Sequence, residues 1–314
     1  MMTMNKLNKV ISIKDISKSF VANKKVIKAL TKVSFDIYEG EVLSILGPNG
    51  AGKTTLINMM LGKLSLSCGE MSLLGYQPGH IELKRQCGAM LQVSGLPDMS
   101  TVKEHIQLFQ SYYANPMDYQ QVVDIAGISK IENQYSKNLS GGQKQRLLFA
   151  LSICGNPKLL FLDEPSVGLD ISARRSLWKA IIDLKNQGTS IILTTHYLEE
   201  ADQLSDRIIM LSKGSVIKTG TPKEIKSQIK NKTIRFTSCL KPLLFESISS
   251  IKHIKSIEKE ENEYQFEIRT NDPVSTLKSI FSLDKTLIDL TVSGAALEDA
   301  FLLLNENESN GESK

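Results

Sequence analysis

The residues from Gly47 to Thr54 read GPNGAGKT and match the pattern G-x-x-x-x-G-K-[ST], whose chemistry is the binding of phosphate. Successive backbone N–H groups of such a loop form a nest for an anion, and the N-terminus of the following helix adds partial positive charge. Lys53 is placed to reach the β- and γ-phosphates of a nucleotide, and Thr54 to offer its hydroxyl to Mg²⁺. Gly50 and Gly52 let the backbone close around the phosphate. The alternative is a chance glycine loop.

A pair of carboxylates follows an apolar run in the segment LLFLDEP, residues 159–165. A buried strand that ends at Asp163 places this carboxylate at the carboxyl edge of a sheet, where the ligands of α/β proteins bind. Asp163 is therefore predicted to be a direct or indirect partner of Mg²⁺, and Glu164 to orient or deprotonate an attacking water. The alternative is an ordinary acidic pair at the end of a strand.

Two further polar residues follow apolar runs. His196 comes directly after SIILTT, residues 190–195, at the same predicted sheet edge as Asp163, so a contact to the γ-phosphate is predicted. Gln92 ends the apolar run GAMLQ and is a neutral candidate for contact with Mg²⁺ and the lytic water. The alternatives are a structural histidine and a glutamine without a role in the site.

A glycine pair stands in the segment NLSGGQKQR, residues 138–146, far along the chain from the phosphate loop. Glycine costs backbone entropy and is usually placed at a sharp turn or where the backbone approaches a ligand. The pair opens the predicted helix GGQKQRLLFALSIC, so Ser140, Gly141, Gly142 and Gln143 stand at a helix N-terminus that can bind an anion.

The elements that must position these residues are indicated by their hydrophobic patterns. Nearly continuous apolar runs predict buried strands at residues 41–47, 158–163, 190–195 and 207–212. Helices alternate with them, and the helix at 172–188 has Ser172 as its expected cap and Gly188 as its stop. The sequence therefore predicts an α/β fold in which helices cover a parallel or mixed sheet.

The pattern changes twice along the chain. Residues 96–138 have helical periodicity without a strand pattern, which predicts a mostly helical insert. Beyond the boundary near residues 220–229, the pattern predicts strands around the helix PVSTLKSIFS and a last helix, ALEDAFLLLNE. The expected parts are a main domain at 8–225 with a helical subdomain at about 94–155, a small accessory α+β domain at 226–304, and a disordered tail at 305–314.

Together these motifs make the chain resemble the nucleotide-binding subunit of ABC transporters from residue 10 to about residue 225. The Walker A loop, Gln92 in the Q-loop, LSGGQ, the Walker B segment LLFLDE, the D-loop SVGLD at 166–170 and the switch His196 occur in the order of that family. The resemblance implies a P-loop NTPase core of ABC ATPase type with an antiparallel β subdomain and a helical subdomain. It also implies ATP and Mg²⁺ as ligands, with the nucleotide held by Gly47, Pro48, Asn49, Gly50, Ala51, Gly52, Lys53, Thr54 and Thr55.

The resemblance also gives the remaining site residues a role. Phe20 in SKSF matches the aromatic residue that stacks on adenine, although tyrosine is commoner there, and a core aromatic is the alternative. In ABC proteins two such domains pair head to tail, and each ATP lies between the phosphate loop of one chain and LSGGQ of the other. Asp170 would lie near that interface, would cap the helix that begins near Ser172, or would do both.

The bulk composition narrows the class of protein. The chain has 314 residues, of which 41% are hydrophobic and 23% charged, as in a soluble globular protein of about two domains. Its net charge of +4 does not argue for nucleic acid as a partner, and its four scattered cysteines contain no C-x-x-C pair, so free thiols are expected. The sequence has no signal-peptide pattern and no apolar run of membrane-spanning length, so membrane contact is expected only through a partner.

By resemblance, the chain is a peripheral subunit on the cytoplasmic face of the cell membrane. Its partners would be a separate membrane-spanning permease, docked near residues 94–106, and a second ATPase subunit in a homodimer or heterodimer. Tyr197 and the segment SGAALEDAFLLL at 293–304 resemble type-two exporters of the daunorubicin and linearmycin kind, which implies a drug, an antibiotic or a lipid-like amphiphile as cargo. An importer subunit and a soluble ABC ATPase not linked to transport are the alternatives.

Overall fold

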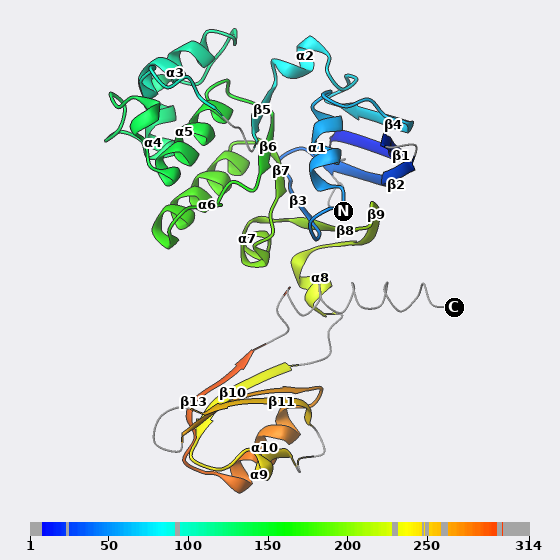
Figure 1. Cartoon of the computed structure of the whole chain (residues 1–314), viewed down its shortest axis with the longest axis vertical. Helices are drawn as coiled ribbons and strands as arrows, with labels where there is room; N and C mark the ends of the chain where they lie inside the picture. The colour runs from blue at the N-terminus through cyan, green and yellow to red at the C-terminus, as the bar shows by residue number, and fades with distance from the viewer. Residues whose placement is uncertain are drawn as a thin grey trace, which may run out of the picture. The chain divides into compact units, whose positions relative to one another are not determined.

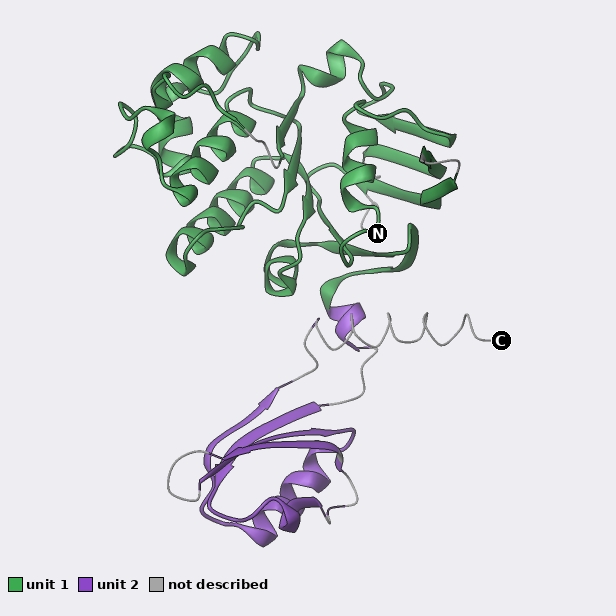
Figure 2. Ribbon diagram, viewed as in Figure 1, with its two compact units in different colours: residues 1–222 green, residues 223–314 purple. Residues whose placement is uncertain are grey.

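The structure is a computed structural model, and it describes residues 8–22, 25–91, 95–227, 232–246, 248, 251–258, 263–293 and 297. Contacts between Cα atoms divide the chain into two compact units, residues 1–222 and residues 223–314 (Figure 2). Each unit has its own clusters of buried apolar side chains, so each is described by itself.

A six-stranded sheet with the strand order β5-β6-β7-β3-β8-β9 is the centre of the first unit (Figure 1). Its neighbouring strands are parallel, except for the antiparallel pair β8 and β9. Every residue of β3, β6 and β7 is buried, which explains their continuous apolar sequences and confirms the predicted strands. The strands are β3 (Val42–Leu46), β5 (Cys87–Met90), β6 (Leu159–Asp163), β7 (Ser190–Thr194), β8 (Arg207–Ser212) and β9 (Ser215–Gly220).

An antiparallel sheet with the order β2-β1-β4 belongs to the same unit. Its apolar side chains share one core cluster with α1 and with side chains of the six-stranded sheet. This is the antiparallel β subdomain that the resemblance implies, and Figure 1 shows it beside α1. Its strands are β1 (Lys9–Ala22), β2 (Lys25–Tyr38) and β4 (Cys68–Leu73).

Helices cover the six-stranded sheet and form the helical subdomain. The chain between β5 and β6 is mainly helical, as predicted, and its helices pack with α6 around a second core cluster (Figure 1). None of the helices in the described ranges has both the length and the apolar character that a bilayer crossing needs. The helices of the first unit are α1 (Lys53–Met60), α2 (Ile81–Lys84), α3 (Val102–Gln110), α4 (Tyr119–Ala126), η1 (Ser136–Asn138, a 3₁₀ helix), α5 (Gly141–Ile153), α6 (Ile171–Asn186) and α7 (Leu198–Leu204). The next helix, α8 (Pro222–Ser227), begins at the boundary and belongs almost wholly to the second unit.

The start of α6 corrects one prediction. Asp170, and not Ser172, is the N-cap, because its Oδ1 accepts a hydrogen bond from the N–H of Ala173 at 2.8 Å. A carboxylate there also interacts favourably with the positive end of the helix dipole, which a hydroxyl does to a smaller extent. Asp170 therefore has a structural role as the cap of α6, whether or not it also lies at an interface.

The second unit is a four-stranded antiparallel sheet with the order β11-β12-β10-β13. Two helices interrupt its strands, and the resulting β-α-β-β-α-β order is that of the ferredoxin-like fold. Stacked and edge-on rings of Phe236, Phe245 and Phe266 are at the centre of its core. Of the predicted last helix, ALEDAFLLLNE, only Leu297 is among the described residues, and the predicted tail lies wholly outside them. The elements are β10 (Lys232–Ser238), α9 (Leu243–Glu246), β11 (Ile251–Glu258), β12 (Tyr264–Thr270), α10 (Pro273–Leu283) and β13 (Ile288–Ser293).

Candidate nucleotide site

The phosphate loop connects β3 to α1, and its backbone depends on glycine. Gly50 and Gly52 have φ angles of +82° and +104°, which residues with a Cβ rarely adopt. A Cβ on Gly52 would lie 2.7 Å from the carbonyl oxygen of Ala29 in β2, and a Cβ on Gly47 would collide with the carbonyl oxygen of Leu211 in β8. The loop therefore packs closely against β2 and β8. Its glycines permit both the turn and this close packing.

Lys53 is the buried cation of this loop. Its side chain is largely buried, and Nζ donates hydrogen bonds to the carbonyl oxygens of Gly47 at 2.7 Å and Pro48 at 3.2 Å. Burial lowers the pKa of Lys53, while the carboxylates of Glu164 and Asp163 oppose that shift by attraction. An ammonium that is held away from water in this way interacts strongly with a phosphate that enters beside it.

A cavity of about 430 Å³ lies over the loop and brings together three segments that are distant in the sequence. They are β2, the loop with the start of α1, and the end of β6. The hydroxyl of Thr54 and the carboxylate of Asp163 are oxygen ligands of the kind that Mg²⁺ takes in proteins. The residues present therefore fit MgATP. The cavity is lined by Ala29, Asn49, Gly50, Gly52, Lys53, Thr54, Thr55, Asp163 and Glu164.

The parallel pairing of β6 and β7 brings the two carboxylates and His196 to one edge of the sheet. Asp163 accepts a hydrogen bond from the hydroxyl of Thr194, and the N–H of Glu164 donates to the carbonyl oxygen of Thr194 at 2.9 Å. Oε1 of Glu164 lies 3.3 Å from Nδ1 of His196. Glu164 has a φ of +52°, a conformation that costs a residue with a side chain on the order of 1–3 kcal/mol. The bonds to Thr194 hold this strained backbone, and such strain is common at functional sites.

The side chains of Tyr197 and Arg174 stack next to His196. The ring centroid of Tyr197 lies 4.2 Å from that of His196, and Cζ of Arg174 on α6 lies 4.6 Å from the Tyr197 centroid. The indole N–H of Trp178 on α6 donates to the buried carboxylate of Glu200 on α7 at 2.9 Å, which ties the two helices together. No motif in the sequence points to Arg174 or Trp178. The neighbouring aromatic rings of His196 and Tyr197 are the only local signal.

LSGGQ does not contribute to this cavity within one chain. Ser140 and Gln143 form a capping box at the start of α5: the N–H of Gln143 donates to Ser140 Oγ at 3.3 Å, and the N–H of Ser140 donates to Gln143 Oε1 at 2.8 Å. A Cβ on Gly141 would meet no described atom within 4 Å, and one on Gly142 would lie at an ordinary distance of 3.5 Å from the Leu169 side chain. Packing within the described part of the chain therefore does not require the glycine pair.

Several other predicted site residues with described positions do not line the cavity: Phe20, Gly47, Pro48, Ala51, Asp170 and His196. Phe20 in β1 has an exposed ring, 37% accessible, with Lys18 Nζ 5.3 Å from its centroid, so it is not a core aromatic. Asp170 is exposed at the start of α6. Gln92 lies outside the described residues.

Comparison with known proteins places this site in a family. The family model described as ABC transporter matches residues 30–167. The Nod factor export ATP-binding protein I of Rhizobium etli is 36% identical over 222 residues, which cover 68% of this chain and 69% of that protein. The chain belongs to the ABC transporter family. By family it is an ABC ATPase.

One further relative and one solved structure show how much of the chain is similar to known ABC proteins. The Nod factor export ATP-binding protein I of Rhizobium johnstonii is 39% identical over 197 residues, or 60% of this chain. The match spans 63% of that relative, which is less than two thirds of its length. A dimeric bacterial ABC transporter cassette, MJ0796, matches with a TM-score of 0.60 and 26% identity over 67% of this chain and 98% of its own. The fold of the first unit is therefore that of an ABC cassette.

Proposed function

We propose that this ABC ATPase binds and hydrolyses MgATP in a head-to-tail dimer and thereby powers a separate membrane-spanning exporter subunit. The observation that carries the proposal is the cavity over the phosphate loop, where Lys53, Asp163 and Glu164 meet, with His196 in contact with Glu164. A buried cation, oxygen ligands for a metal ion and a carboxylate for water are the parts that phosphoryl transfer requires.

Each of these residues has a defined task in the proposal. Lys53 exchanges its bonds to two backbone carbonyls for bonds to the β- and γ-phosphates. Thr54 and Asp163 would hold Mg²⁺, which neutralises the charge that develops on the phosphates. Glu164 accepts the proton of the attacking water, while His196 orients Glu164 and contacts the γ-phosphate.

The remaining predicted contacts complete the nucleotide site as proposals. Phe20 stacks on adenine, for which an exposed ring is suitable. Gln92 contacts Mg²⁺ and the lytic water. Asp170 lies at the interface between two ATPase chains, where its capping bond to Ala173 fixes the start of α6.

Tyr197 is expected to affect catalysis through His196. Tyr197→Ala removes the ring between His196 and Arg174, whose aromatic and cation–π contacts are each worth about 0.5–1.5 kcal/mol. We expect kcat to fall about 3- to 10-fold with little change in KM for ATP, because the histidine acts on Glu164 rather than on binding. Tyr197→Phe keeps the ring and is expected to retain wild-type kcat. Equal losses in both variants, or a change confined to KM, would refute this positioning role.

A second chain is proposed to complete the site. Gly141 is exposed and Gly142 half-buried, and open space over Gly141 leaves the start of α5 and its helix dipole accessible to a phosphate on another molecule. The match to a dimeric ABC cassette supports the same arrangement. Either two copies of this chain or one copy with a related ATPase would serve.

The membrane-spanning partner is proposed to dock on the helical subdomain. A groove of about 190 Å³ there is lined by Gly95, Leu96, Asp98 and Ser136, and by Lys144 and Leu148 of α5. Next to it, Met99 is 68% exposed and Tyr135 is 44% exposed. Exposed apolar side chains beside a groove are suited to contact with a partner protein. The groove begins three residues after Gln92, so the position of the partner and the state of the nucleotide are proposed to be coupled through this segment.

Met99→Glu is expected to weaken the association with the membrane subunit about tenfold or more, because a charge would enter an apolar contact. The chain would be co-expressed with its membrane-spanning partner, sought as the product of a neighbouring gene, and the fraction of the chain that sediments with membranes would be measured. Ile81→Glu changes another exposed apolar residue, 56% accessible and on α2, and is the control. Retention of Met99→Glu at the wild-type level would exclude this groove as the docking site.

Export of an amphiphile is the proposed direction and cargo, and the cytoplasmic face of the cell membrane the proposed location. The names of the two Rhizobium relatives, which are Nod factor export ATP-binding proteins, support export. The resemblance to drug-resistance exporters extends the proposal to a drug, an antibiotic or a lipid-like molecule. Increased susceptibility to such compounds after deletion of the gene would be the test of cargo.

Hydrolysis by a dimer is tested by dilution of the purified full chain. The turnover of MgATP per chain is expected to rise with protein concentration, since two chains form each site. Phosphate release would be followed over a dilution series with ATP in excess. Constant turnover per chain at every dilution would contradict the two-chain site.

A further inference from the structure

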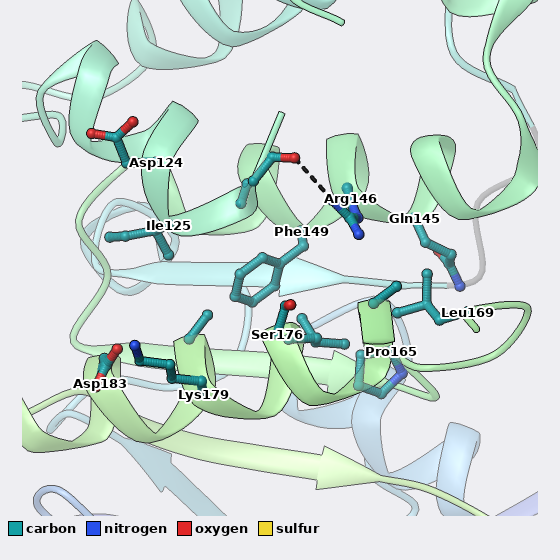
Figure 3. Close-up of a pocket in the computed structure, with 15 residues that line it drawn as sticks. Asp124, Ile125, Gln145, Arg146, Phe149, Pro165, Leu169, Ser176, Lys179 and Asp183 are labelled. Atoms are coloured by element: carbon teal, nitrogen blue, oxygen red, sulfur yellow. Dashed lines mark hydrogen bonds between the residues drawn. The ribbon is translucent and has the colours of Figure 1, made fainter. Parts of the chain in front are cut away.

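A second cavity, of about 450 Å³, lies between the helical subdomain and α6 (Figure 3). Its walls come from α4, α5, α6 and the segment that follows Glu164. It shares no lining residue with the cavity over the phosphate loop, nor with the groove beside Met99. The function proposed above therefore leaves it unused.

The floor of this cavity is apolar. Phe149 from α5, Leu169, and Leu177 and Ala180 from α6 are all buried and line it. Figure 3 shows the ring of Phe149 at its centre, facing Ser176. A cavity of this size with an apolar floor is within the range that small organic ligands occupy.

One end of the cavity is acidic. Asp124 from α4 and Asp183 from α6 lie at that end, with Lys179 beside Asp183, whereas Arg146 lies further along (Figure 3). Among the described residues neither carboxylate forms an ion pair, although Asp124 accepts a hydrogen bond from Gln120. Arg146 already donates to the carbonyl oxygen of Gly127 at 3.0 Å.

The position of both carboxylates on their helices is unfavourable unless a cation is nearby. Asp124 is in the last turn of α4 and Asp183 in the last turn of α6, where the helix dipole places partial negative charge. Lys179 lies on the rim one turn before Asp183 but forms no ion pair with it in the described part of the structure. The adjoining surface hollow adds Asp118 and four amide side chains and no basic residue. Together with Asp118, the two carboxylates outnumber Lys179 at this end, so its net charge is negative and favours a positive group.

We propose that this cavity binds a small aromatic amine in its cationic form, with the rings on the floor around Phe149 and the ammonium group between Asp124 and Asp183. The apolar floor supplies the affinity for the rings, and the two unpaired carboxylates select the charge. An aromatic anion of the same size is disfavoured by both carboxylates and both helix C-termini.

A ligand there contacts the two parts of the chain whose alignment the proposed ATPase needs. Gln145 and Arg146 belong to the helix that LSGGQ begins, and Pro165 and Leu169 belong to the segment between Glu164 and Asp170. The amide of Gln145 also donates to the carbonyl oxygen of Val167 at 3.2 Å, which ties the helix to that segment. Binding is therefore expected to change the rate of hydrolysis, a consequence that rests on the proposed function.

The binding test uses the full chain without nucleotide and a matched pair of probes. The probes are 9-aminoacridine, a cation at neutral pH, and acridine-9-carboxylate, an anion with the same rings. Titration calorimetry is expected to give saturable binding of one 9-aminoacridine per chain and binding of the carboxylate at least about tenfold weaker. Absence of saturable 9-aminoacridine binding, or equal binding of the two probes, would overturn the proposal.

Three variants locate the binding. Ser176→Trp, at an exposed position that faces the floor, fills the cavity and is expected to abolish binding. The double variant Asp124→Asn/Asp183→Asn is expected to weaken it about 3- to 10-fold, because partly solvated charge pairs contribute modestly. Glu70→Gln removes an exposed carboxylate on β4 and is the control. Unfolding temperatures within a few degrees of wild type would verify folding, and unchanged binding by Ser176→Trp would place the probe elsewhere and refute the site.

The effect on hydrolysis is measured separately from binding. Saturating 9-aminoacridine is expected to change the MgATP turnover of the wild type at least about twofold. The turnover of Ser176→Trp is expected to be the same with and without the probe. If the chain hydrolyses no ATP without a probe, the proposed function fails while the binding result stands. Unaltered turnover at saturation would refute the coupling.

Discussion

Glu164→Gln is expected to reduce MgATP hydrolysis about 10²- to 10⁴-fold while ATP binding persists, because an amide cannot accept the proton of the attacking water. The substitution keeps the shape of the side chain, the backbone bond to Thr194 and the polar contact towards His196. Hydrolysis would be measured as phosphate release under single-turnover conditions. Because ATP is then bound but not consumed, the variant is also expected to accumulate as an ATP-bound dimer, visible by light scattering.

The control is Glu199→Gln, which changes an exposed glutamate in the first turn of α7, three residues after His196. It removes the same charge from the same edge of the sheet and is expected to leave turnover near the wild-type value. Hydrolysis by Glu164→Gln at the wild-type rate would show that another group activates the water.

Ser140→Arg is expected to abolish hydrolysis that depends on dimer formation and to leave ATP binding by the single chain nearly intact. Ser140 is exposed and lines no part of the cavity over the phosphate loop. The introduced arginine side chain is therefore expected to block only a second chain that approaches the start of α5. Nucleotide binding would be measured by fluorescence of a labelled ATP. Dimer formation would be measured in the Glu164→Gln background, where the expected result is a monomer.

Ser140→Ala separates the loss of the cap from the blocking of the interface. It removes the hydrogen bond from the N–H of Gln143 to Ser140 Oγ, worth about 1 kcal/mol of stability, but leaves the surface open. It is expected to dimerise and to hydrolyse ATP, although with a lower unfolding temperature. If Ser140→Arg lost ATP binding before it lost dimer formation, LSGGQ would belong to the pocket of its own chain.

The fold class could be predicted because its strongest signals are local. A parallel strand covered on both faces must be apolar throughout, and β3, β6 and β7 are. β5 has no such signal: its four residues, CGAM, include Gly88, which pairs with Leu160 and where a Cβ would collide with the carbonyl oxygen of Ser152. It is a strand because β6 and α5 pack against it, and tertiary contacts of that kind have no signature in four residues.

The start of α6 at Asp170 is a second feature that depended on tertiary contacts rather than on the sequence pattern. Both Asp170 and Ser172 are good caps by residue type, so the pattern alone does not choose between them. The choice depends on which side chain reaches a free N–H, and Asp170 reaches that of Ala173.

The sequence by itself determined the phosphate loop, the carboxylate pair and the position of His196 after a strand, because each is a short segment whose chemistry is contained in adjacent residues. Only the tertiary structure decided which distant groups meet there. The order of β6, β7 and β3 puts Thr194 against Asp163, and the packing of α6 on α7 puts Arg174 against Tyr197. The cavity between α4, α5 and α6 was likewise decided by packing, since its acidic end joins two helices whose sequences carry no common pattern. Contacts of this kind depend on strand order and helix packing, which the whole chain sets together.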